Sequence, residues 1–282
     1  MRPLRLHLPQ FRPGTAALVE PEPLSLFDPI HLGADAWGLP AHLTLAYRNL
    51  LLGGEPGAGK SNAAAQIVSH ACLCPDVRLW LFDGKRVELG LFRPLTERFV
   101  GPNLPDAIDT LRFLGTRLDE RYEWLDATGR RKLTPAESQG WDLVVVDELV
   151  LFTATYGTPT EQKEFSALLR DIVGRGRAVC MPVLASALRP SSEVVPTSLR
   201  DLFAYRWAFR ATTGDSSDVV LGNGWATRGY DSSQIHPEAR GVGYLRAEGG
   251  IPRRVKAAYL TDDDIAGIVT AGLHLRSTVG AR

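Results

Sequence analysis

The sequence of 282 residues predicts an α/β fold, in which a mostly parallel central sheet is covered by helices on both faces. Three observations support this prediction. Two short runs, Leu50 to Leu52 and Leu143 to Val146, are wholly apolar, as strands buried on both faces require. Residues 104–127 repeat apolar side chains at three- and four-residue spacing, which is typical of an amphipathic helix. Strand-like and helix-like segments alternate along most of the chain, and this alternation favours parallel pairing.

The first part of the chain divides into an arm and the start of a folded domain. Residues 1–26 are rich in proline and show little periodicity, so we expect an extended arm. Residues 27–47 contain two strand-like stretches around Gly38-Leu39-Pro40. The apolar run from Leu50 to Leu52 follows as a third strand.

The middle of the chain supplies the alternating elements. Residues 77–83 form a strand, and a helix over 104–127 follows Asn103, a residue suited to an N-cap. A wholly apolar strand over 141–146 comes next, and then a helix that Thr160 caps and that ends near Val173. Further strands are predicted over 178–185, where Pro182 removes one ladder hydrogen bond, and over 202–209.

The last part of the chain predicts a strand pair, over 243–246 and 254–259, and a final helix after residues 261–264. Residues 271–282 are expected to be a frayed tail. The folded domain therefore spans residues 27–270.

A phosphate-binding motif follows the third strand at once. Residues 54–61 match G-x-x-x-x-G-K-[ST] without a mismatch, and an alanine-rich helical stretch comes next. Glycines allow backbone N–H groups to converge on phosphate oxygens, and the helix adds the positive end of its dipole. The residues predicted to contact the nucleotide are Gly54, Glu55, Pro56, Gly57, Ala58, Gly59, Lys60, Ser61 and Asn62.

Within this motif, Lys60 is predicted to reach the β- and γ-phosphates, and the Ser61 hydroxyl to ligate Mg²⁺. Asp147 and Glu148 end the apolar strand over 141–146. One carboxylate at such a strand end orients the magnesium ion, so Asp147 takes that role. Glu148 is then the candidate to polarise the water that attacks the γ-phosphate. The sequence thus predicts a site that binds and hydrolyses ATP.

Hydrolysis of this kind also needs a positively charged side chain beside the γ-phosphate, and a neighbouring subunit often supplies it. Arg175 and Arg177 lie in a glycine-containing turn after the helix that ends near Val173. Both are candidates, and we prefer Arg177. An ordinary solvated turn is the alternative.

Composition limits the classes of protein to which this chain can belong. With 44% hydrophobic residues the chain can bury a full core, and its formal net charge of zero offers no global attraction to nucleic acid. No apolar run approaches the length of a membrane span, and the N-terminus lacks a signal-peptide core. The three cysteines suggest no disulfide framework, which favours a reduced, cytoplasmic chain.

Several stretches, taken in order, resemble the motor domain of FtsK/SpoIIIE-type DNA translocases, and more narrowly the short FtsK-like transfer proteins of actinobacterial conjugative elements. Residues 82–89 resemble the family's D-P-K-x-x-E-L segment, and 118–122 its E-x-R-Y helix. Residues 144–149 resemble V-V-V-D-E-[FL], and 176–178 the G-R-A turn. Arg189-Pro190-Ser191, with Asp201 and Asp215-Ser216 downstream, resembles the family's R-P-S…D…D-S tract. The resemblance covers roughly residues 27–270.

Three positions in two stretches depart from the family pattern. Ala187 and Leu188 stand where the family carries Thr-Gln before Arg-Pro-Ser, and the family glutamine is thought to sense the γ-phosphate. Its loss puts the coupling of hydrolysis to movement in doubt, unless Ser186 substitutes for it. Gly84 replaces the proline of D-P-K, which should matter less.

The resemblance implies a RecA-like P-loop NTPase fold that uses ATP and Mg²⁺ in a homo-hexameric ring around double-stranded DNA. It also implies action at the inner face of the membrane, beside a membrane-anchored partner protein. The expected function is ATP-driven translocation of double-stranded DNA during conjugative transfer. Two alternatives stay open: a related ring ATPase that energises protein secretion, and a nucleotide-dependent scaffold that hydrolyses weakly. The basic turn over 130–132 and the aromatic loop over 222–230 are candidate DNA contacts, although both also suit plain surface loops.

Overall fold

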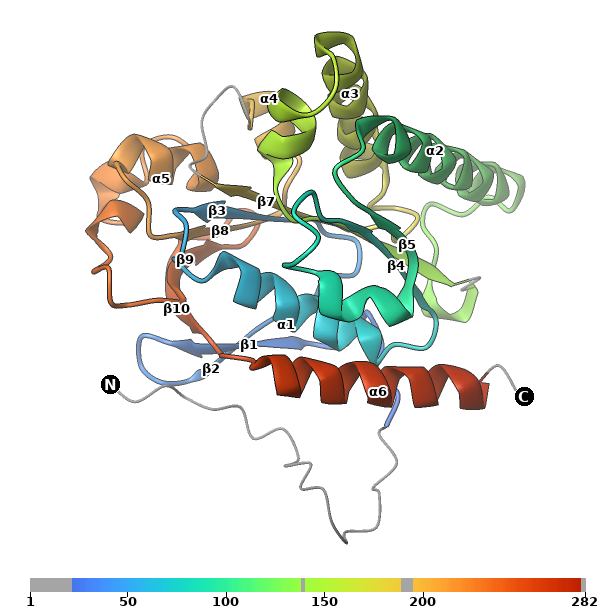
Figure 1. The fold of residues 1–282 in the computed structure, drawn as a ribbon, viewed down its shortest axis with the longest axis horizontal. Helices are drawn as coiled ribbons and strands as arrows, with labels where there is room; N and C mark the ends of the chain where they lie inside the picture. The colour runs from blue at the N-terminus through green and yellow to red at the C-terminus, as the bar shows by residue number, and fades with distance from the viewer. Residues whose placement is uncertain (1–21, 138–139, 189–194, 280–282) are drawn as a thin grey trace, which may run out of the picture.

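The computed structural model describes residues 22–137, 140–188 and 195–279, and Figure 1 shows their arrangement. The strands are β1 (Ile30–Asp35), β2 (Pro40–Leu43), β3 (Leu50–Gly54), β4 (Val77–Phe82), β5 (Thr96–Val100), β6 (Trp141–Val146), β7 (Val183–Leu188), β8 (Tyr205–Phe209), β9 (Val242–Arg246) and β10 (Arg253–Ala257). The α-helices are α1 (Lys60–Cys72), α2 (Leu104–Ala127), α3 (Pro159–Arg175), α4 (Thr197–Arg200), α5 (Gly214–Leu221) and α6 (Asp262–Val279).

These strands form one sheet in the order β2-β1-β10-β9-β8-β3-β7-β6-β4-β5. The strands from β8 to β5 are parallel, whereas β9, β10, β1 and β2 extend the sheet by antiparallel pairing. Because β3 and β6 lie within the parallel part and both faces are covered, their side chains are buried throughout. The phosphate-binding strand β3 lies between β7 and β8.

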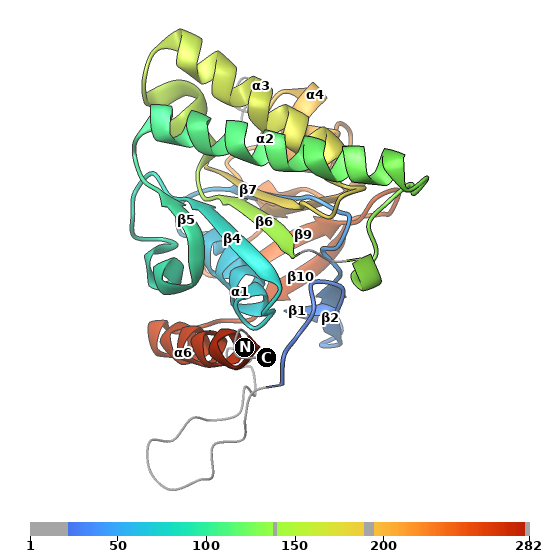
Figure 2. The same ribbon diagram turned by 90° about the vertical axis from the view of Figure 1, so that its right-hand side faces the viewer.

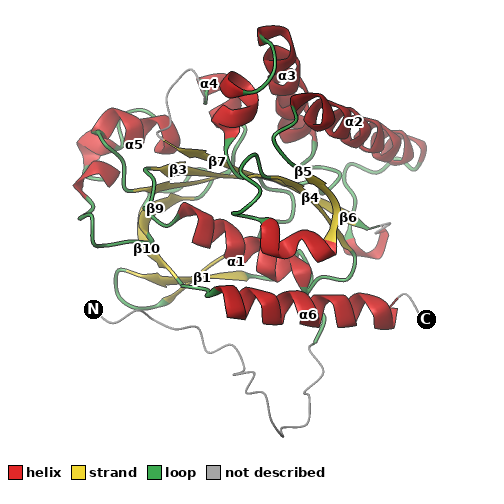
Figure 3. Cartoon of the chain, viewed as in Figure 1, coloured by secondary structure: helices red, strands yellow, loops and turns green. Residues whose placement is uncertain are grey.

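Helices cover the sheet on two sides. Figure 2 shows α2 and α3 side by side over one face and α1 and α6 over the other. Figure 3 shows the same layers by secondary structure. The predicted α/β architecture, with a parallel central sheet and helices on both faces, is confirmed.

Helix α3 begins two residues earlier than predicted. Thr158, and not Thr160, is its N-cap, and the Thr158 hydroxyl accepts a hydrogen bond from the Glu161 N–H while the Glu161 carboxylate accepts one from the Thr158 N–H. This reciprocal capping box, with Pro159 in the first turn, fixes the start of the helix. The helix also continues past Gly174 to Arg175.

Strand β7 begins five residues later than the predicted strand over 178–185. Cys180 has a left-handed backbone with φ of +48°, and Met181 N–H donates to Gly176 O at 2.8 Å, so the chain turns here. The strand starts after Pro182, whose carbonyl accepts from Val144 N–H at 3.1 Å. Proline has no N–H to donate, which explains why regular pairing begins beyond it.

The expected frayed tail from residue 271 is wrong as far as Val279, because α6 continues to that residue. Leu275 is buried, and a Cβ on Gly272 would lie 2.5 Å from the carbonyl oxygen of Cys72, so α6 packs closely on the end of α1. The close approach that glycine allows holds the last turns in place. No described helix is long and apolar enough to cross a membrane.

Residues 1–21 of the predicted arm lie outside the described residues. The last part of that arm packs on the domain: Leu24 N–H donates to Leu73 O at 2.9 Å, and Leu26 is fully buried. The candidate motif Arg189-Pro190-Ser191 also lies outside the described residues.

A buried carboxylate joins α2 to the sheet. Asp142 in β6 has a fully buried side chain, which accepts from Arg78 Nε at 3.0 Å and Trp80 Nε1 at 2.8 Å. Arg117 and Arg121 of α2 bind its second oxygen. Burial by itself would raise the pKa of Asp142, but Arg121, Arg78 and Arg117 outweigh it, so the pKa is lowered and the group stays charged.

We expect Asp142→Asn to lower the free energy of unfolding by about 3–5 kcal/mol, because it leaves partly buried guanidinium groups without their counter-charge. Urea unfolding followed by circular dichroism measures this loss. The control is Asp109→Asn, which breaks the exposed pair with Arg112 and should change the midpoint little. Equal midpoints for Asp142→Asn and the unmodified chain would contradict the expectation.

Candidate nucleotide site

The phosphate loop connects the end of β3 to the start of α1, as the motif predicts. Gly57 and Gly59 adopt φ values of +72° and +108°, which a side chain would strain. Gly59 has a second reason to be glycine, since a Cβ there would lie 2.6 Å from the backbone of Gly241. Gly241 N–H also donates to Ala58 O at 2.8 Å, so the segment before β9 supports the loop from behind.

Two residues that follow β8, Arg210 and Thr212, hold Glu55 of the phosphate loop in place. Glu55 N–H donates to Arg210 O at 2.8 Å, and the Glu55 carboxylate pairs with the Arg210 guanidinium at 2.6 Å. Thr212 Oγ1 donates to the same carboxylate at 2.8 Å. The sequence alone did not indicate Arg210 and Thr212, because only the pairing of β8 beside β3 brings them to Glu55.

The Lys60 ammonium folds over the loop. It donates to the carbonyl oxygens of Gly54 and Glu55, both at 2.8 Å. Burial lowers the pKa of Lys60 to about 8, while the carboxylates of Glu148 and Asp147 act in the opposite direction. A buried ammonium beside turn N–H groups suits a phosphate, whose charge would replace the weak partial charge of two carbonyls.

A cavity of about 330 Å³ opens in front of the loop. Its lining residues are Pro56, Gly57, Gly59, Lys60, Ser61, Asn62, Lys85, Glu88, Asp147, Glu148, Ser186 and Leu188. Of the predicted nucleotide contacts, six line the cavity, and Gly54, Glu55 and Ala58 shape the loop from behind. Asn62 also donates to Leu260 O at 3.0 Å and so ties α1 to the chain before α6.

Asp147 follows the last residue of β6 and lines the same cavity as the loop. Burial raises its pKa to about 7; the ammonium of Lys85 lowers it, and the charges of Glu88, Asp83 and Glu148 add to the rise. Among the described residues its Oδ2 atom accepts no hydrogen bond. A buried carboxylate oxygen without a donor is a strong fit to a divalent cation, and Ser61 lines the same cavity as a second oxygen ligand.

Glu148 is held by the end of β7. The Leu188 N–H donates to both carboxylate oxygens, at 3.1 Å and 3.0 Å, and the Val150 N–H lies at 3.4 Å. Burial raises the pKa of Glu148, and the N–H groups of Leu188 and Val150 act against that rise. A carboxylate with a raised pKa and a fixed orientation is suited to accept a proton from water.

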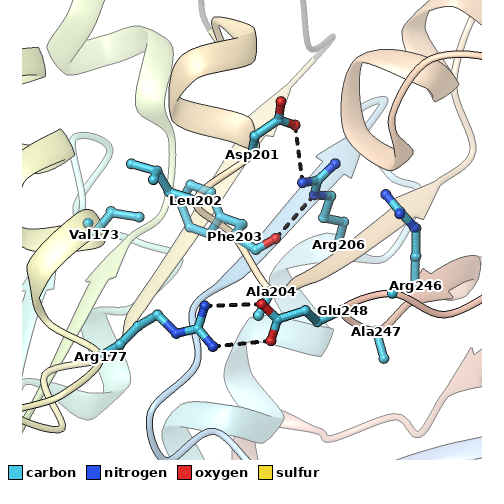
Figure 4. Close-up of a pocket in the computed structure, with 12 residues that line it drawn as sticks. Val173, Arg177, Asp201, Leu202, Phe203, Ala204, Arg206, Arg246, Ala247 and Glu248 are labelled. Carbon is cyan, nitrogen blue, oxygen red and sulfur yellow. Dashed lines mark hydrogen bonds and ion pairs between the residues drawn. The ribbon is translucent and has the colours of Figure 1, made fainter. Parts of the chain in front are cut away.

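Arg177 and Arg175 lie away from this cavity in the same chain. Arg177 Nε donates to Tyr47 O at 3.2 Å, just before β3 begins, whereas the phosphate loop follows the end of β3. Its guanidinium binds both oxygens of Glu248 at 3.1 Å, beside a second cavity of about 190 Å³ (Figure 4). Arg175, the last residue of α3, pairs with Asp119 and Asp171.

The two candidate DNA segments are engaged within the domain. Arg130 pairs with Glu137 at 3.2 Å, and the Lys132 ammonium lies 4.9 Å from the centre of the Tyr47 ring. In the aromatic loop over 222–230, the guanidinium groups of Arg228 and Arg246 lie 5.1 Å and 5.2 Å from the centre of the Trp225 ring. These contacts give both segments a structural role, and DNA contact stays a prediction.

The comparisons with known proteins agree with this geometry. A sequence model of the FtsK/SpoIIIE family matches residues 29–228. The chain belongs to the FtsK/SpoIIIE family. Two relatives, the DNA translocases FtsK of Pseudomonas aeruginosa and Chlorobaculum tepidum, are each 25% identical to it and align with 86% and 79% of this chain. The alignments cover 33% and 29% of those relatives, so the chain spans about a third of their length.

Solved structures show the same fold. The pCW3 conjugation coupling protein TcpA, in a monomer form with ATPγS, superposes with a TM-score of 0.76 at 19% identity, over 93% of this chain and 75% of that one. The cytoplasmic domain of the Thermomonospora curvata type VII secretion ATPase EccC gives 0.69 at 22% identity, over 90% and 32%. The predicted RecA-like P-loop ATPase fold of the FtsK/SpoIIIE family is confirmed.

The structure explains one departure from the family pattern. At Gly84, where the family carries proline, an added Cβ would lie 2.7 Å from Leu151 Cδ1 and 3.0 Å from Tyr156 Cε2. Tyr156 also donates its hydroxyl to Gly84 O at 3.0 Å. Leu151 and Tyr156 therefore fill the space that a larger residue would need, and the turn keeps its shape without the proline.

At the family's Thr-Gln position, Leu188 lies in the cavity wall but contacts Glu148 through its backbone N–H. Ser186, two residues earlier on β7, also lines the cavity. An apolar Leu188 side chain cannot donate a hydrogen bond to a phosphate. The strand is thus linked to Glu148 through the main chain, and Ser186 supplies the only side-chain hydroxyl that β7 places in the lining.

Proposed function

We propose that the chain is an ATP-driven translocase that hydrolyses ATP to move double-stranded DNA during conjugative transfer. One observation carries the hydrolytic part: the phosphate loop, an Asp147 oxygen that accepts no hydrogen bond among the described residues, and the oriented Glu148 face one cavity. The DNA part is supported by family membership and by the curated relatives, which are named DNA translocases. The conjugative context is supported by the likeness to a protein named a conjugation coupling protein.

Each residue has a role that follows from its place. The loop N–H groups and the Lys60 ammonium bind the phosphates, and Ser61 and Asp147 would hold Mg²⁺, which when bound supplies positive charge to the phosphate oxygens. Glu148 orients the attacking water and accepts its proton. Arg177 projects from the edge of the sheet opposite the loop, so we propose that it completes the site of a neighbouring subunit in a homo-hexameric ring. We further propose that the ring works at the inner face of the membrane, beside a membrane-anchored partner protein.

A secretion ATPase is the second candidate. The fold is shared with EccC, which is named a type VII secretion ATPase, and with EssC of Geobacillus thermodenitrificans, at a TM-score of 0.72 and 14% identity. Leu188 in place of the family glutamine also suits an ATPase whose hydrolysis is coupled to something other than DNA movement. A scaffold that hydrolyses weakly is the third candidate, and the intact Glu148 argues against it.

The test is steady-state ATP hydrolysis with and without linear duplex DNA. We expect duplex DNA to raise the rate of hydrolysis at least about tenfold, because DNA bound in the central channel of the proposed ring would stimulate the ATP sites. The stimulation should weaken with added salt, since the protein would bind the DNA through its backbone phosphates. Lys60→Ala and Glu148→Gln are the controls and should remove the stimulated activity. Robust hydrolysis that ignores DNA would favour the secretion ATPase. Tight ATP binding without hydrolysis would favour the scaffold.

A further inference from the structure

We propose that Lys85 is a second phosphate-binding lysine and that it detects the γ-phosphate. The proposal rests on the function proposed above and deepens it, because it assigns a role to a residue outside the phosphate loop and the carboxylate pair. Lys85 lies in the segment that follows β4 and lines the same cavity as Lys60.

The segment that carries Lys85 is held rigidly. The Asp83 carboxylate is fully buried, and it accepts from the backbone N–H groups of Lys85 at 3.0 Å, Arg86 at 2.8 Å and Leu89 at 2.9 Å. Three N–H bonds to one carboxylate close the segment into a compact turn. Tyr156 also fixes it through the Gly84 carbonyl. The turn therefore presents the Lys85 side chain from a defined position.

The sheet brings that side chain to Asp147. Strands β4 and β6 pair in parallel up to Phe82 and Val146, and Asp147 N–H donates to Phe82 O at 3.0 Å. The Lys85 ammonium consequently lies 3.8 Å from Asp147 Oδ2. Since that oxygen accepts no hydrogen bond among the described residues, charge alone holds the two groups together. A closer anion can draw the ammonium away from Asp147.

The negative charge in the cavity favours a second cationic side chain beside the bound nucleotide. Its lining includes two ammonium groups, Lys60 and Lys85, against the carboxylates of Glu88, Asp147 and Glu148. Without Lys85, a single ammonium would face three carboxylates and a triphosphate. Lys60 approaches from the phosphate loop, whereas Lys85 approaches from the side of Asp147. The γ-phosphate is the part of the nucleotide nearest the metal and the attacking water, so Lys85 meets it rather than the α-phosphate.

The experiment measures equilibrium binding of ATPγS and of ADP, each with Mg²⁺, by isothermal titration calorimetry. Lys85→Met keeps a long side chain and removes the charge; more than a third of the Lys85 side chain is exposed, so the variant should fold. We expect it to weaken ATPγS binding at least about tenfold and ADP binding less than about threefold, as the loss of one charged contact predicts. Lys85→Arg should retain the preference for ATPγS.

Arg86→Met is the matched control, because Arg86 is the next residue along the turn and does not line the cavity. It should leave both affinities unchanged. Lys60→Ala should weaken both nucleotides. Unchanged ATPγS binding in Lys85→Met, or an equal loss for both nucleotides, would overturn the role of Lys85 while leaving the proposed function intact. A wild-type chain that binds neither nucleotide would overturn the proposed function and this assignment together.

Discussion

Replacing Glu148 by glutamine should lower the rate of ATP hydrolysis by about 10²- to 10⁴-fold, the usual contribution of a general base. Glutamine has the same shape and can still accept the Leu188 N–H bond that orients the wild-type side chain. It cannot take a proton from water. ATP affinity should therefore stay within about threefold of wild type, which is about half of the 1.4 kcal/mol that a tenfold change represents.

Single-turnover hydrolysis and nucleotide binding, measured on the same preparation, separate these two quantities. Glu88→Gln is the matched control, since Glu88 lines the same cavity from the turn after β4, whereas Glu148 is the carboxylate that β7 orients. It should keep most of the activity. If Glu148→Gln hydrolyses ATP at the wild-type rate, another group activates the water, and the assignment of Glu148 is wrong.

Replacing Arg177 by alanine should lower hydrolysis by about 10³- to 10⁵-fold if its guanidinium completes a neighbour's site, as arginine fingers do. Within its own chain Arg177 binds Glu248 and Tyr47 at the edge of the sheet opposite the phosphate loop. The variant should therefore bind ATP normally while failing to hydrolyse it.

Mixing variants shows whether the site is shared. A Lys60→Ala subunit retains its finger but has no working site, and an Arg177→Ala subunit retains its site but has no finger. Together they should recover activity that neither shows alone. Arg175→Ala is the control, because Arg175 already pairs with Asp119 and Asp171 on the helices, and it should hydrolyse ATP normally. Wild-type rates in Arg177→Ala would exclude a finger role.

What the sequence could predict about the site is encoded by neighbouring residues. The phosphate loop is contiguous, so spacing alone could place Lys60 and Ser61 at one site, and both line the cavity; their roles toward phosphate and Mg²⁺ stay predictions. Asp147 and Glu148 follow a wholly apolar strand, and such a strand in an α/β sheet ends at the edge where ligands bind. Arg177 was chosen because hydrolysis needs a positive charge beside the γ-phosphate, and its role in a neighbouring subunit's site stays a prediction.

The predicted boundaries of helices and strands were wrong where local signals in the sequence allowed more than one start or end. Thr158 and Thr160 are both acceptable caps, and only the reciprocal bond with Glu161 selects the first. The apolar run before Pro182 reads as strand, but the chain turns there through Cys180 and starts β7 later. The last turns of α6 looked frayed because their partner, Cys72 at the end of α1, is about 200 residues away in sequence.

The sequence by itself determined that a phosphate-binding motif follows one apolar strand, that two carboxylates end another, and which family the chain resembles, because each rests on a short contiguous pattern. Only the tertiary structure decided what supports and completes the site. Arg210 reaches Glu55, Leu188 holds Glu148 and Lys85 faces Asp147 because β8, β7 and β4 lie beside β3 and β6 in the sheet. Strand order follows from burying both faces under connecting helices, a property of the whole chain that no local pattern encodes.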